Sequence, residues 1–216
     1  MNCLIIAATP IEIAPFIRAL QKVKVTSKKW EVDVLITGIG LLATSYTLQK
    51  QLQLKRPDLI IQAGVGGCFN KEFPLGKVVL IKKETIADQS VIELNALKTL
   101  FDLKLVPANQ FPYKKGWLEN NNPLLKKVRL PKVTGISVNE ITTDKKKVRF
   151  YQEQFNPVVE SMEGAALHYI GLQEKIPFLQ IRSCSNYIAE RNKKNWKMKD
   201  AIQQLNVELL KLVAAL

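Results

Sequence analysis

Short, continuous runs of apolar residues recur along the chain and alternate with longer amphipathic stretches. Apolar runs that lack a polar residue at every second position are typical of strands covered on both faces, as in a parallel sheet. The sequence therefore predicts buried strands at residues 3–8, 32–37, 58–63, 77–81 and 177–184.

Two other stretches have the periodicity of an amphipathic helix. In residues 41–54 the apolar stripe repeats at steps of four, three and four, and Pro57 follows where a helix is expected to have ended. A second stripe near the C-terminus consists of Met198, Ile202, Leu205, Leu209 and Leu212. Strands alternating with helices predict a single α/β domain over residues 1–216, with a mostly parallel sheet and helices on both faces.

Parallel sheets of this kind bind ligands beyond the carboxyl ends of their strands, so the residues that follow the predicted strands are candidates for a site. Glycine-rich segments occupy two of these positions, at residues 38–40 and 64–67. Residues 88–130 contain three prolines and a run of three asparagines. We expect them to form an irregular insertion with short elements that shapes the mouth of the pocket.

Residues 38–43 (GIGLLA) match the dinucleotide-binding fingerprint G-x-G-x-x-[G/A]. That fingerprint needs an acidic residue about 20 positions further on, at the end of the next strand. Asp58 has this separation but stands at the start of its predicted strand, and the motif follows the second strand rather than the first. The triphosphate-binding motif G-x-x-x-x-G-K-[ST] is also missing, so we expect no nucleotide cofactor.

Cys3, Cys68 and Cys184 are odd in number, far apart and embedded in apolar runs. This spacing fits neither a disulfide framework nor a zinc site, so we expect reduced core cysteines and no metal. The first eight residues lack the basic segment of a signal peptide, and no apolar run approaches the roughly 18 to 20 residues that span a bilayer. These observations predict a cytoplasmic protein.

Basic residues exceed acidic residues by 32 to 19, which gives a formal net charge of +13. Such an excess raises the alternative of a nucleic-acid-binding domain. The chain has no helix-turn-helix glycine pattern, no zinc-finger spacing and no aromatic-rich strand of the RNA-recognition type. The excess lies in short clusters at residues 22–29, 126–132, 145–149 and 191–199. We therefore expect solvated lysines, and no nucleic-acid or membrane partner.

Polar side chains occur where several predicted strands end. Glu12 follows the first strand, Glu163 lies where a helix is expected to begin, and Ser185-Asn186 ends the last predicted strand. Singly, each has an ordinary interpretation as a first-turn helix acid or a turn residue. Because strand exits share one edge of a parallel sheet, these groups can converge on one pocket.

The order and spacing of these segments resemble the nucleoside phosphorylase and nucleosidase superfamily over nearly the whole chain. The matching segments are IIAATPIE, TGIG, PDLIIQAGVGG, PLGKVV, SMEGAA and IRSCSN. The resemblance implies a three-layer α/β/α domain with a central, mostly parallel, twisted mixed sheet, which usually dimerises. It also implies that Glu163 accepts hydrogen bonds from the ribose hydroxyls, while Met162 and the adjoining main chain, including Ser161, pack on the sugar.

Cleavage of an N-glycosidic bond builds positive charge on the ribose and negative charge on the leaving purine. In the hydrolase branch of the family, a carboxylate at the position of Glu12 activates water as a general base. Phosphorylases typically hold phosphate with an arginine just before the second glycine segment, where this chain reads IQAGV. The resemblance therefore favours a purine nucleosidase without a cofactor.

The base-binding position indicates which purine is cleaved. Family members that cleave adenine nucleosides end this strand in Ser-Asp, whereas this chain has Ser185-Asn186. An amide donates to a 6-oxo group and accepts from a protonated N7, which suits hypoxanthine. With the tail that follows, the chain resembles the futalosine hydrolases of menaquinone biosynthesis, which release hypoxanthine and dehypoxanthinyl futalosine. Their substrate carries a benzoate with which Arg191 can pair, although Arg191 can equally be a solvated residue of a basic run.

Two positions depart from the family pattern. Val65-Gly66 replaces a small polar residue followed by alanine, and Ile141 replaces an aromatic residue that stacks on the base. Three alternatives therefore stay open: an adenine-specific methylthioadenosine/S-adenosylhomocysteine or aminodeoxyfutalosine nucleosidase, a phosphate-dependent phosphorylase, and the nucleic-acid-binding domain considered above.

Overall fold

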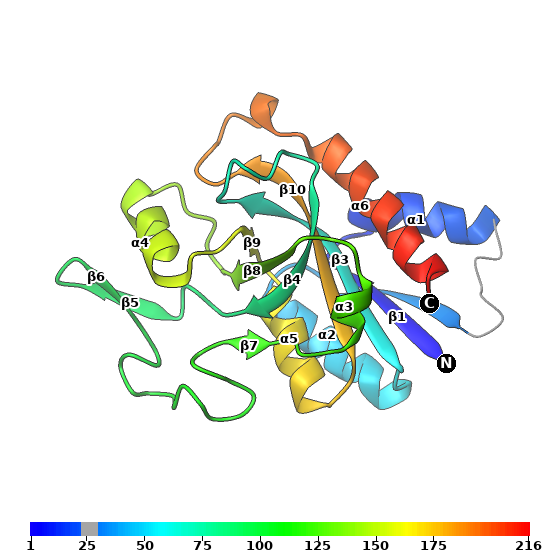
Figure 1. The fold of residues 1–216 in the computed structure, drawn as a ribbon, viewed down its shortest axis with the longest axis horizontal. Helices are drawn as coiled ribbons and strands as arrows, with labels where there is room; N and C mark the ends of the chain where they lie inside the picture. Colours follow the sequence, from blue (N-terminus) through cyan, green and yellow to red (C-terminus); the bar gives the residue numbers. More distant parts are fainter. Residues whose placement is uncertain (23–29) are drawn as a thin grey trace.

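The computed structural model describes residues 1–22 and 30–216. The first third of the chain contains β1 (Asn2–Ala7), α1 (Pro10–Lys22), β2 (Glu31–Ile36), α2 (Leu41–Leu54) and β3 (Leu59–Cys68) (Figure 1). The remainder contains β4 (Val78–Glu84), β5 (Ser90–Glu93), β6 (Ala96–Thr99), β7 (Leu118–Glu119), α3 (Leu124–Lys127), β8 (Lys132–Ser137), α4 (Lys145–Phe155), β9 (Val159–Ser161), α5 (Gly164–Gln173), β10 (Phe178–Tyr187), the 3-10 helix η1 (Lys193–Asn195) and α6 (Met198–Ala214). This alternation confirms the predicted α/β class.

The main sheet is mixed and partly closed. Within the described ranges it has eight strands in the order β10-β4-β8-β9-β3-β1-β2, with β7 paired to β4. Five pairings in these ranges are parallel and three, β4–β10, β3–β9 and β4–β7, are antiparallel. Because β10 also pairs with β3, the strands β10, β4, β8, β9 and β3 form a closed ring. The prediction of a mostly parallel mixed sheet is confirmed.

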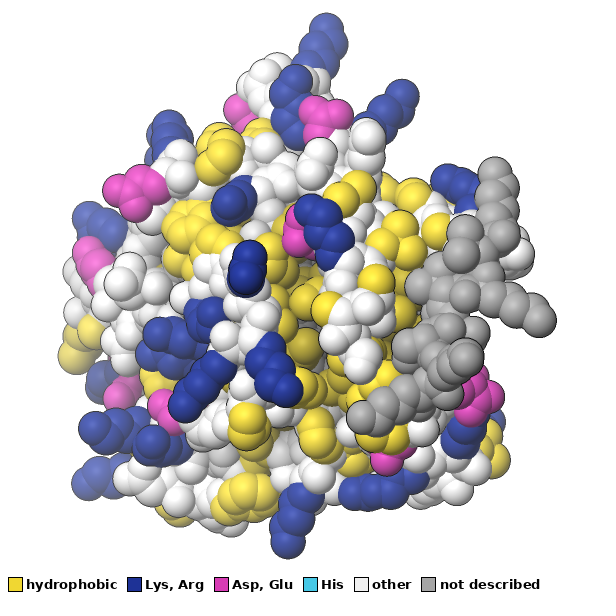
Figure 2. Space-filling view, turned by 45° about the vertical axis from the view of Figure 1, so that its right-hand side comes forward, with side chains coloured by type: hydrophobic (Ala, Val, Ile, Leu, Met, Phe, Trp, Pro, Cys, Tyr) yellow, Lys and Arg dark blue, Asp and Glu magenta, His cyan; other side chains and the backbone are white. Residues whose placement is uncertain are grey.

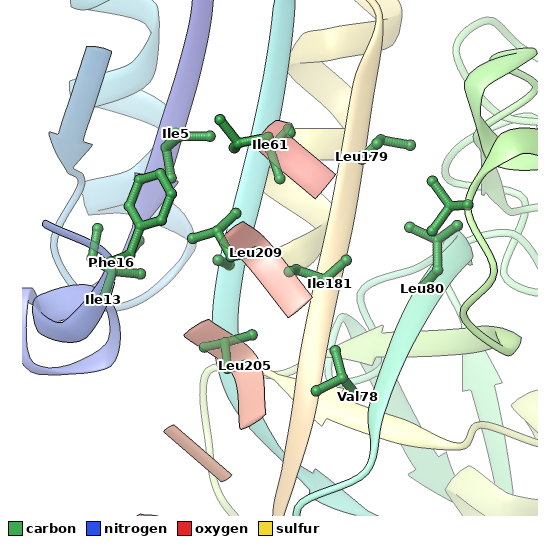
Figure 3. Packing of buried hydrophobic residues seen from close by; sticks show 14 of the residues in the cluster. Ile5, Ile13, Phe16, Ile61, Val78, Leu80, Leu179, Ile181, Leu205 and Leu209 are labelled. Carbon is green, nitrogen blue, oxygen red and sulfur yellow. The ribbon is translucent and has the colours of Figure 1, made fainter. Parts of the chain in front are cut away.

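Helices cover both faces of the open part of the sheet. On one face, Ile5 of β1 and Ile61 of β3 pack with Phe16 of α1 and Leu209 of α6 (Figure 3). The neighbouring strand residues point the other way and pack on α2 and α5; this second core includes Leu4, Ile6, Leu48, Leu52, Ile60, Leu167 and Ile170. Since successive strand residues face opposite layers, both must be apolar. This explains the continuous apolar runs and gives a three-layer α/β/α arrangement.

The two central strands are longer than the sequence predicts. β3 continues through the glycines at 64–67, and β10 continues through Ser185 and Asn186. The prediction that residues 64–67 follow their strand was wrong, because β3 and β10 pair with each other along this length. Ser185 and Asn186 lie at the end of β10, as predicted, and the strand extends one residue further to Tyr187. Glycine permits close approach there: a Cβ on Gly66 would lie 2.7 Å from the main-chain oxygen of Glu160. Residues 38–40 do form the predicted turn, with φ of 86° at Gly38 and 91° at Gly40.

The segment 88–130 has the irregular character predicted for it. It contains the β5–β6 hairpin, the two-residue strand β7 and the four-residue helix α3, joined by turns. The predicted C-terminal helix is α6, in which Leu205 and Leu209 are buried against the sheet. Met198 and Ile202, at its N-terminal end, instead line the cavity described below.

On the face shown in Figure 2, lysine and arginine side chains surround an area of apolar surface, and several of them lie close together on the lower left of the view. Residues 23–29, which make up most of the first predicted lysine cluster, lie outside the described residues. In the part of the chain that is described, no helix combines the length and apolarity needed to cross a membrane.

Candidate active site

A cavity of about 340 Å³ lies at the carboxyl ends of β1, β3, β9 and β10. Its lining includes every site residue predicted from the sequence: Glu12, Val65, Gly66, Ile141, Ser161, Met162, Glu163, Ser185, Asn186 and Arg191. These residues come from elements spread over the whole chain, so their convergence is a property of the fold. Their chemical roles stay predictions, and the contacts of each side chain are described below.

Glu12 lies in the first turn of α1, and three donors hold its buried carboxylate at the cavity wall. The Val65 N–H donates to Oε1 at 3.0 Å. The Thr9 N–H and hydroxyl donate to Oε2 at 3.0 and 3.1 Å. An ionised carboxylate has about four acceptor positions, so this arrangement leaves capacity to accept a hydrogen from a bound water. The Glu12 carboxylate is therefore held in one orientation at the cavity wall, with one acceptor position left for a ligand.

A buried asparagine fixes the backbone of the same helical turn. Asn206 of α6 donates from Nδ2 to the Glu12 carbonyl at 2.8 Å, and its Oδ1 accepts from the Phe16 N–H at 2.9 Å. In a regular helix the Phe16 N–H would donate to the Glu12 carbonyl, and here the Asn206 side chain lies between these two groups. Pro15, the residue before Phe16, is also inside this helix. Sequence reasoning missed Asn206; the signal is a lone polar residue on the apolar stripe of α6.

Glu163 occupies the N-cap position of α5 and is also buried. Its Oε1 accepts from the Gly40 N–H at 3.2 Å, and its Oε2 accepts from Arg182 Nη2 at 3.2 Å. The ion pair is almost fully enclosed, with the two side chains 6% and 2% exposed. A buried charge that is paired and hydrogen-bonded keeps one orientation, so Glu163 presents a fixed acceptor to the cavity.

Arg182 lies beneath both carboxylates, and sequence reasoning missed its role. A Cβ on Gly64 would come within 2.3 Å of Arg182 Nη1 and 3.0 Å of Glu12 Oε1. Glycine at position 64 therefore makes room for the guanidinium, which also donates to the Val65 carbonyl at 3.3 Å. The available signal was a lone arginine inside the apolar run of the last strand.

Ser185 and Asn186 form a second polar group on β10. The Ser185 hydroxyl lies 2.8 Å from Asn186 Oδ1 and 3.1 Å from the Gly66 carbonyl, and its single hydrogen is shared between these two acceptors. Asn186 Nδ2 donates to the Tyr187 carbonyl at 3.2 Å. Since an amide nitrogen carries two hydrogens, one remains for a ligand. This orientation lets Asn186 donate to an acceptor atom of a ligand in the cavity.

The segment after β10 folds over the rim of the cavity. Trp196 lines the cavity and donates from its indole N–H to the Glu190 carbonyl at 3.0 Å. The Glu190 carboxylate in turn accepts from the Asn192 N–H and from Asn195 Nδ2, each at 2.7 Å. Arg191 projects from this folded segment and is exposed at the rim. Ile141, on the loop after β8, is likewise an exposed part of the lining.

A further carboxyl group, Glu84, is enclosed beneath the site. It accepts from the Ser137 hydroxyl at 3.2 Å and is completely buried. A Cβ on Gly135 or Gly164 would lie 2.6 or 2.5 Å from Glu84 Oε2, so both glycines are needed to house it. Burial raises its pKa to about 8, although the nearby Arg182 and the Ser137 hydrogen bond act in the opposite direction.

This burial predicts an unusual dependence of stability on pH. The pKa of Glu84 rises from 4.5 to about 8 on folding, so the folded state binds the extra proton and loses stability as pH rises through this window. Glu84→Gln, which mimics the neutral form, is expected to make the fall in Tm between pH 6.5 and 8.5 shallower. Thermal unfolding across that range measures it, with the exposed Glu153→Gln as control. Parallel curves for the wild type and Glu84→Gln would contradict the prediction.

Buried cysteine and histidine side chains belong to the core. Cys3, Cys68 and Cys184 are free and buried, and burial raises the pKa of the Cys3 thiol to about 12. His168 is completely enclosed on α5, and burial lowers its pKa to about 4, so it is neutral near pH 7. Among the described residues, no group of three or more His, Cys, Asp and Glu side chains is arranged to hold a metal ion.

Comparison with known proteins shows the family of the chain. A futalosine hydrolase of Streptomyces coelicolor is 24% identical over 196 residues, covering 85% of this chain and 79% of the relative. A 5′-methylthioadenosine/S-adenosylhomocysteine nucleosidase of Buchnera aphidicola is 25% identical over 168 residues, covering 74% and 68%. The structure of futalosine hydrolase of Helicobacter pylori superposes with a TM-score of 0.80 at 19% identity, covering 100% of this chain and 98% of that one. The family model of the phosphorylase superfamily matches residues 3–216, and the chain therefore belongs to that superfamily.

Proposed function

We propose that this protein is an N-ribosyl hydrolase that cleaves purine nucleosides with water. The observation that carries the proposal is the placement of two buried, hydrogen-bonded carboxylates, Glu12 and Glu163, on the same cavity as Asn186. The names of the relatives, which are nucleosidases and futalosine hydrolases, support the same reaction class.

Each group has a distinct task in this reaction. Glu163 accepts hydrogen bonds from the ribose hydroxyls and, with Met162, positions the sugar. Glu12 removes a proton from the attacking water as the bond to the purine breaks. Asn186 donates to the base and stabilises the negative charge that develops on it. The carboxylates also favour the positive charge that develops on the ribose, so the site is complementary to the transition state.

Water is preferred to phosphate as the nucleophile because of the charges in the cavity. Phosphate needs cationic or N–H donors around it. Among the described residues that line the cavity, Arg191 is the single lysine or arginine, and it lies at the rim. Arg182 is already paired with Glu163. This distribution favours a hydrolase over a phosphorylase.

For the substrate, we infer futalosine, cleaved to hypoxanthine and dehypoxanthinyl futalosine. Asn186 replaces the acid expected of an adenine-specific enzyme, and its free amide hydrogen suits the 6-oxo group. The exposed Arg191 on the cavity rim can pair with a carboxylate on the 5′ side of the nucleoside. The second candidate is a methylthioadenosine/S-adenosylhomocysteine nucleosidase, which the Buchnera aphidicola relative favours.

The decisive experiment incubates the purified protein with futalosine in phosphate-free buffer and measures released hypoxanthine. Parallel reactions contain methylthioadenosine, or futalosine with added phosphate. Hypoxanthine release without phosphate supports the proposal. If adenine is released faster from methylthioadenosine than hypoxanthine from futalosine, methylthioadenosine is the preferred substrate. If a base is released only when phosphate is added, the enzyme is a phosphorylase and the proposal of hydrolysis is wrong.

Replacing Asn186 by aspartate is expected to shift base preference toward 6-amino purines. The carboxylate accepts from an amino group but cannot donate to a 6-oxo group unless it is protonated. Since about 1.4 kcal/mol corresponds to a tenfold change, loss of one hydrogen bond in this pocket should move the ratio of kcat/KM values for adenine and hypoxanthine nucleosides about tenfold. An unchanged ratio would place base selection elsewhere.

We also propose that the protein forms a homodimer through the surface beside the cavity mouth. Leu42 and Tyr46 lie four residues apart on α2, so they share one helix face, and both are exposed. Ile39, which precedes α2, is also exposed and lines the cavity. A second copy seated on these side chains would cover an apolar surface and enclose the cavity. Light scattering of the wild type and of Leu42→Glu tests this, because the variant should be monomeric.

A further inference from the structure

Glu84 does not line the cavity, yet it lies directly against the helix that begins at Glu163. It is the last residue of β4 and has no exposed surface. Glu163 is the N-cap residue of α5, and Gly164 is the first residue of the helix. A Cβ on Gly164 would lie 2.5 Å from Glu84 Oε2. The carboxyl group of Glu84 therefore packs against the first turn of the helix that presents the proposed ribose acceptor.

The first turn of α5 is capped by a side chain other than that of its own N-cap residue. An N-cap side chain ordinarily accepts from an N–H group of the first turn. The Glu163 side chain makes no such bond. Instead, the Ala165 N–H donates to Ser137 Oγ at 2.8 Å, and the Ser137 hydroxyl donates to Glu84 Oε1 at 3.2 Å. Ser137 and Glu84 thus supply the missing cap, which leaves the carboxylate of Glu163 free to face the cavity.

Arg182 acts on both buried carboxyl groups. Its Nη2 atom donates to Glu163 Oε2 at 3.2 Å, and its charge also favours the ionised form of Glu84. In an enclosed site one cation neutralises one carboxylate, and a second negative charge there is costly. A neutral Glu84 leaves the guanidinium to Glu163, whereas an ionised Glu84 competes for it.

We propose that Glu84 is a positioning residue, which acts through Ser137 and Arg182 to hold Glu163 in the orientation that accepts the ribose hydroxyls. The inference rests on the proposed nucleosidase function and deepens it, because it extends sugar recognition to a residue that the substrate does not touch. A small displacement of a group that orients the substrate lowers the rate strongly, so the support behind Glu163 matters for turnover.

The surroundings of Glu84 give this support a pH dependence. Burial raises the pKa of Glu84 to about 8; Arg182 of β10 and the hydrogen bond from Ser137 of β8 act in the opposite direction, and the charge of Glu163 adds to the rise. His168 of α5 is neutral near pH 7, because burial lowers its pKa to about 4. As pH rises through 8, Glu84 loses its proton and competes for Arg182. The value of kcat/KM should fall in the same range.

The pH profile of kcat/KM tests this dependence, with futalosine, or with methylthioadenosine if that is the preferred substrate. The wild type and the exposed control Glu153→Gln should lose about tenfold in kcat/KM between pH 7 and pH 9. Glu84→Gln stays neutral and keeps an acceptor for Ser137. It should lie within about threefold of the wild type at pH 7 and should not show the alkaline fall. Ionisation of the substrate is common to all three proteins, so the difference between the profiles reports Glu84.

Glu84→Leu tests the positioning role at pH 7. The Ser137 hydroxyl then lacks its acceptor, so KM for the nucleoside should rise and kcat/KM should fall by about tenfold. The free base has no ribose, so its affinity in calorimetry should stay within about twofold of the wild type. Ser137→Ala should have the same effect as Glu84→Leu. The double variant should lose little more than either single variant, because the two residues act in one chain of contacts.

Equal pH profiles for the wild type and Glu84→Gln would overturn the inference and leave the proposed function intact. A loss of base affinity as large as the loss of nucleoside turnover in Glu84→Leu would also overturn it, because that result indicates a general defect of the fold. The profile of Glu84→Gln decides the question even where the leucine variant does not fold. Wild-type protein that hydrolyses neither futalosine nor methylthioadenosine would overturn both proposals.

Discussion

Glu12→Gln is expected to abolish nucleoside hydrolysis while leaving the site assembled. An amide cannot take a proton from water, and loss of a general base typically lowers kcat by about 10²- to 10⁴-fold. The glutamine oxygen can still accept from the Val65 N–H, which holds the side chain on β3 in the wild type. Product hypoxanthine should therefore bind within a few-fold of its wild-type affinity.

Two measurements separate this chemical effect from a structural one. Single-turnover rates report the chemical step, and calorimetric binding of hypoxanthine reports the pocket. Glu72→Gln, an exposed substitution of the same kind, should match the wild type in both. A Glu12→Gln enzyme with full single-turnover rates would remove Glu12 from the role of base. A variant that no longer binds hypoxanthine would show that Glu12 mainly supports the fold of the site.

Glu163→Ala should lower stability and activity together, because the residue serves the fold and the substrate at once. The substitution leaves Arg182 buried without its carboxylate, and breaking such a pair typically costs about 3 to 5 kcal/mol. It also removes the proposed acceptor for the ribose hydroxyls, which should reduce kcat/KM by about 100-fold or more.

A second substitution separates these effects. In Glu163→Ala/Arg182→Met the unpaired charge is removed, and replacing a buried ion pair by apolar groups is often close to neutral for stability. The double variant should regain most of the lost Tm but none of the activity. Thermal unfolding and kinetics of the single and double variants complete the cycle. Recovery of activity along with stability would mean that Glu163 does not contact the substrate.

The sequence predicted the layers of the fold well because strand and helix patterns are local. The helix at 41–54 was predicted with the bounds that α2 has. Strand β9 escaped prediction because a three-residue strand has no period to detect. The end of β3 was misplaced because glycine usually indicates a break in a strand, whereas here pairing with β10 extends β3 through residues 64–67. The predicted bounds of β10 stop at residue 184 because the apolar run ends there, and the same pairing continues the strand to Tyr187.

The residues of the candidate site were likewise predicted where the signal is local in the sequence and missed where it is not. Residues in contiguous motifs, such as Glu163 in SMEGAA and Asn186 in IRSCSN, were identified and line the cavity. Arg182 and Asn206 were missed, since their importance lies in contacts with residues 19 and 194 positions away.

The closed ring of strands has a consequence for how the enzyme is made. β10 completes the ring by pairing with β3 on one side and β4 on the other, yet it is the last strand of the sheet to leave the ribosome. Until residue 187 has been synthesised, the edges of β3 and β4 that pair with β10 are unpaired in the nascent chain. Unpaired strand edges promote aggregation. The same strand carries Arg182 and Asn186, so the candidate active site and the protection of those edges arise in one late step. A chain truncated before β10 should therefore be both inactive and insoluble.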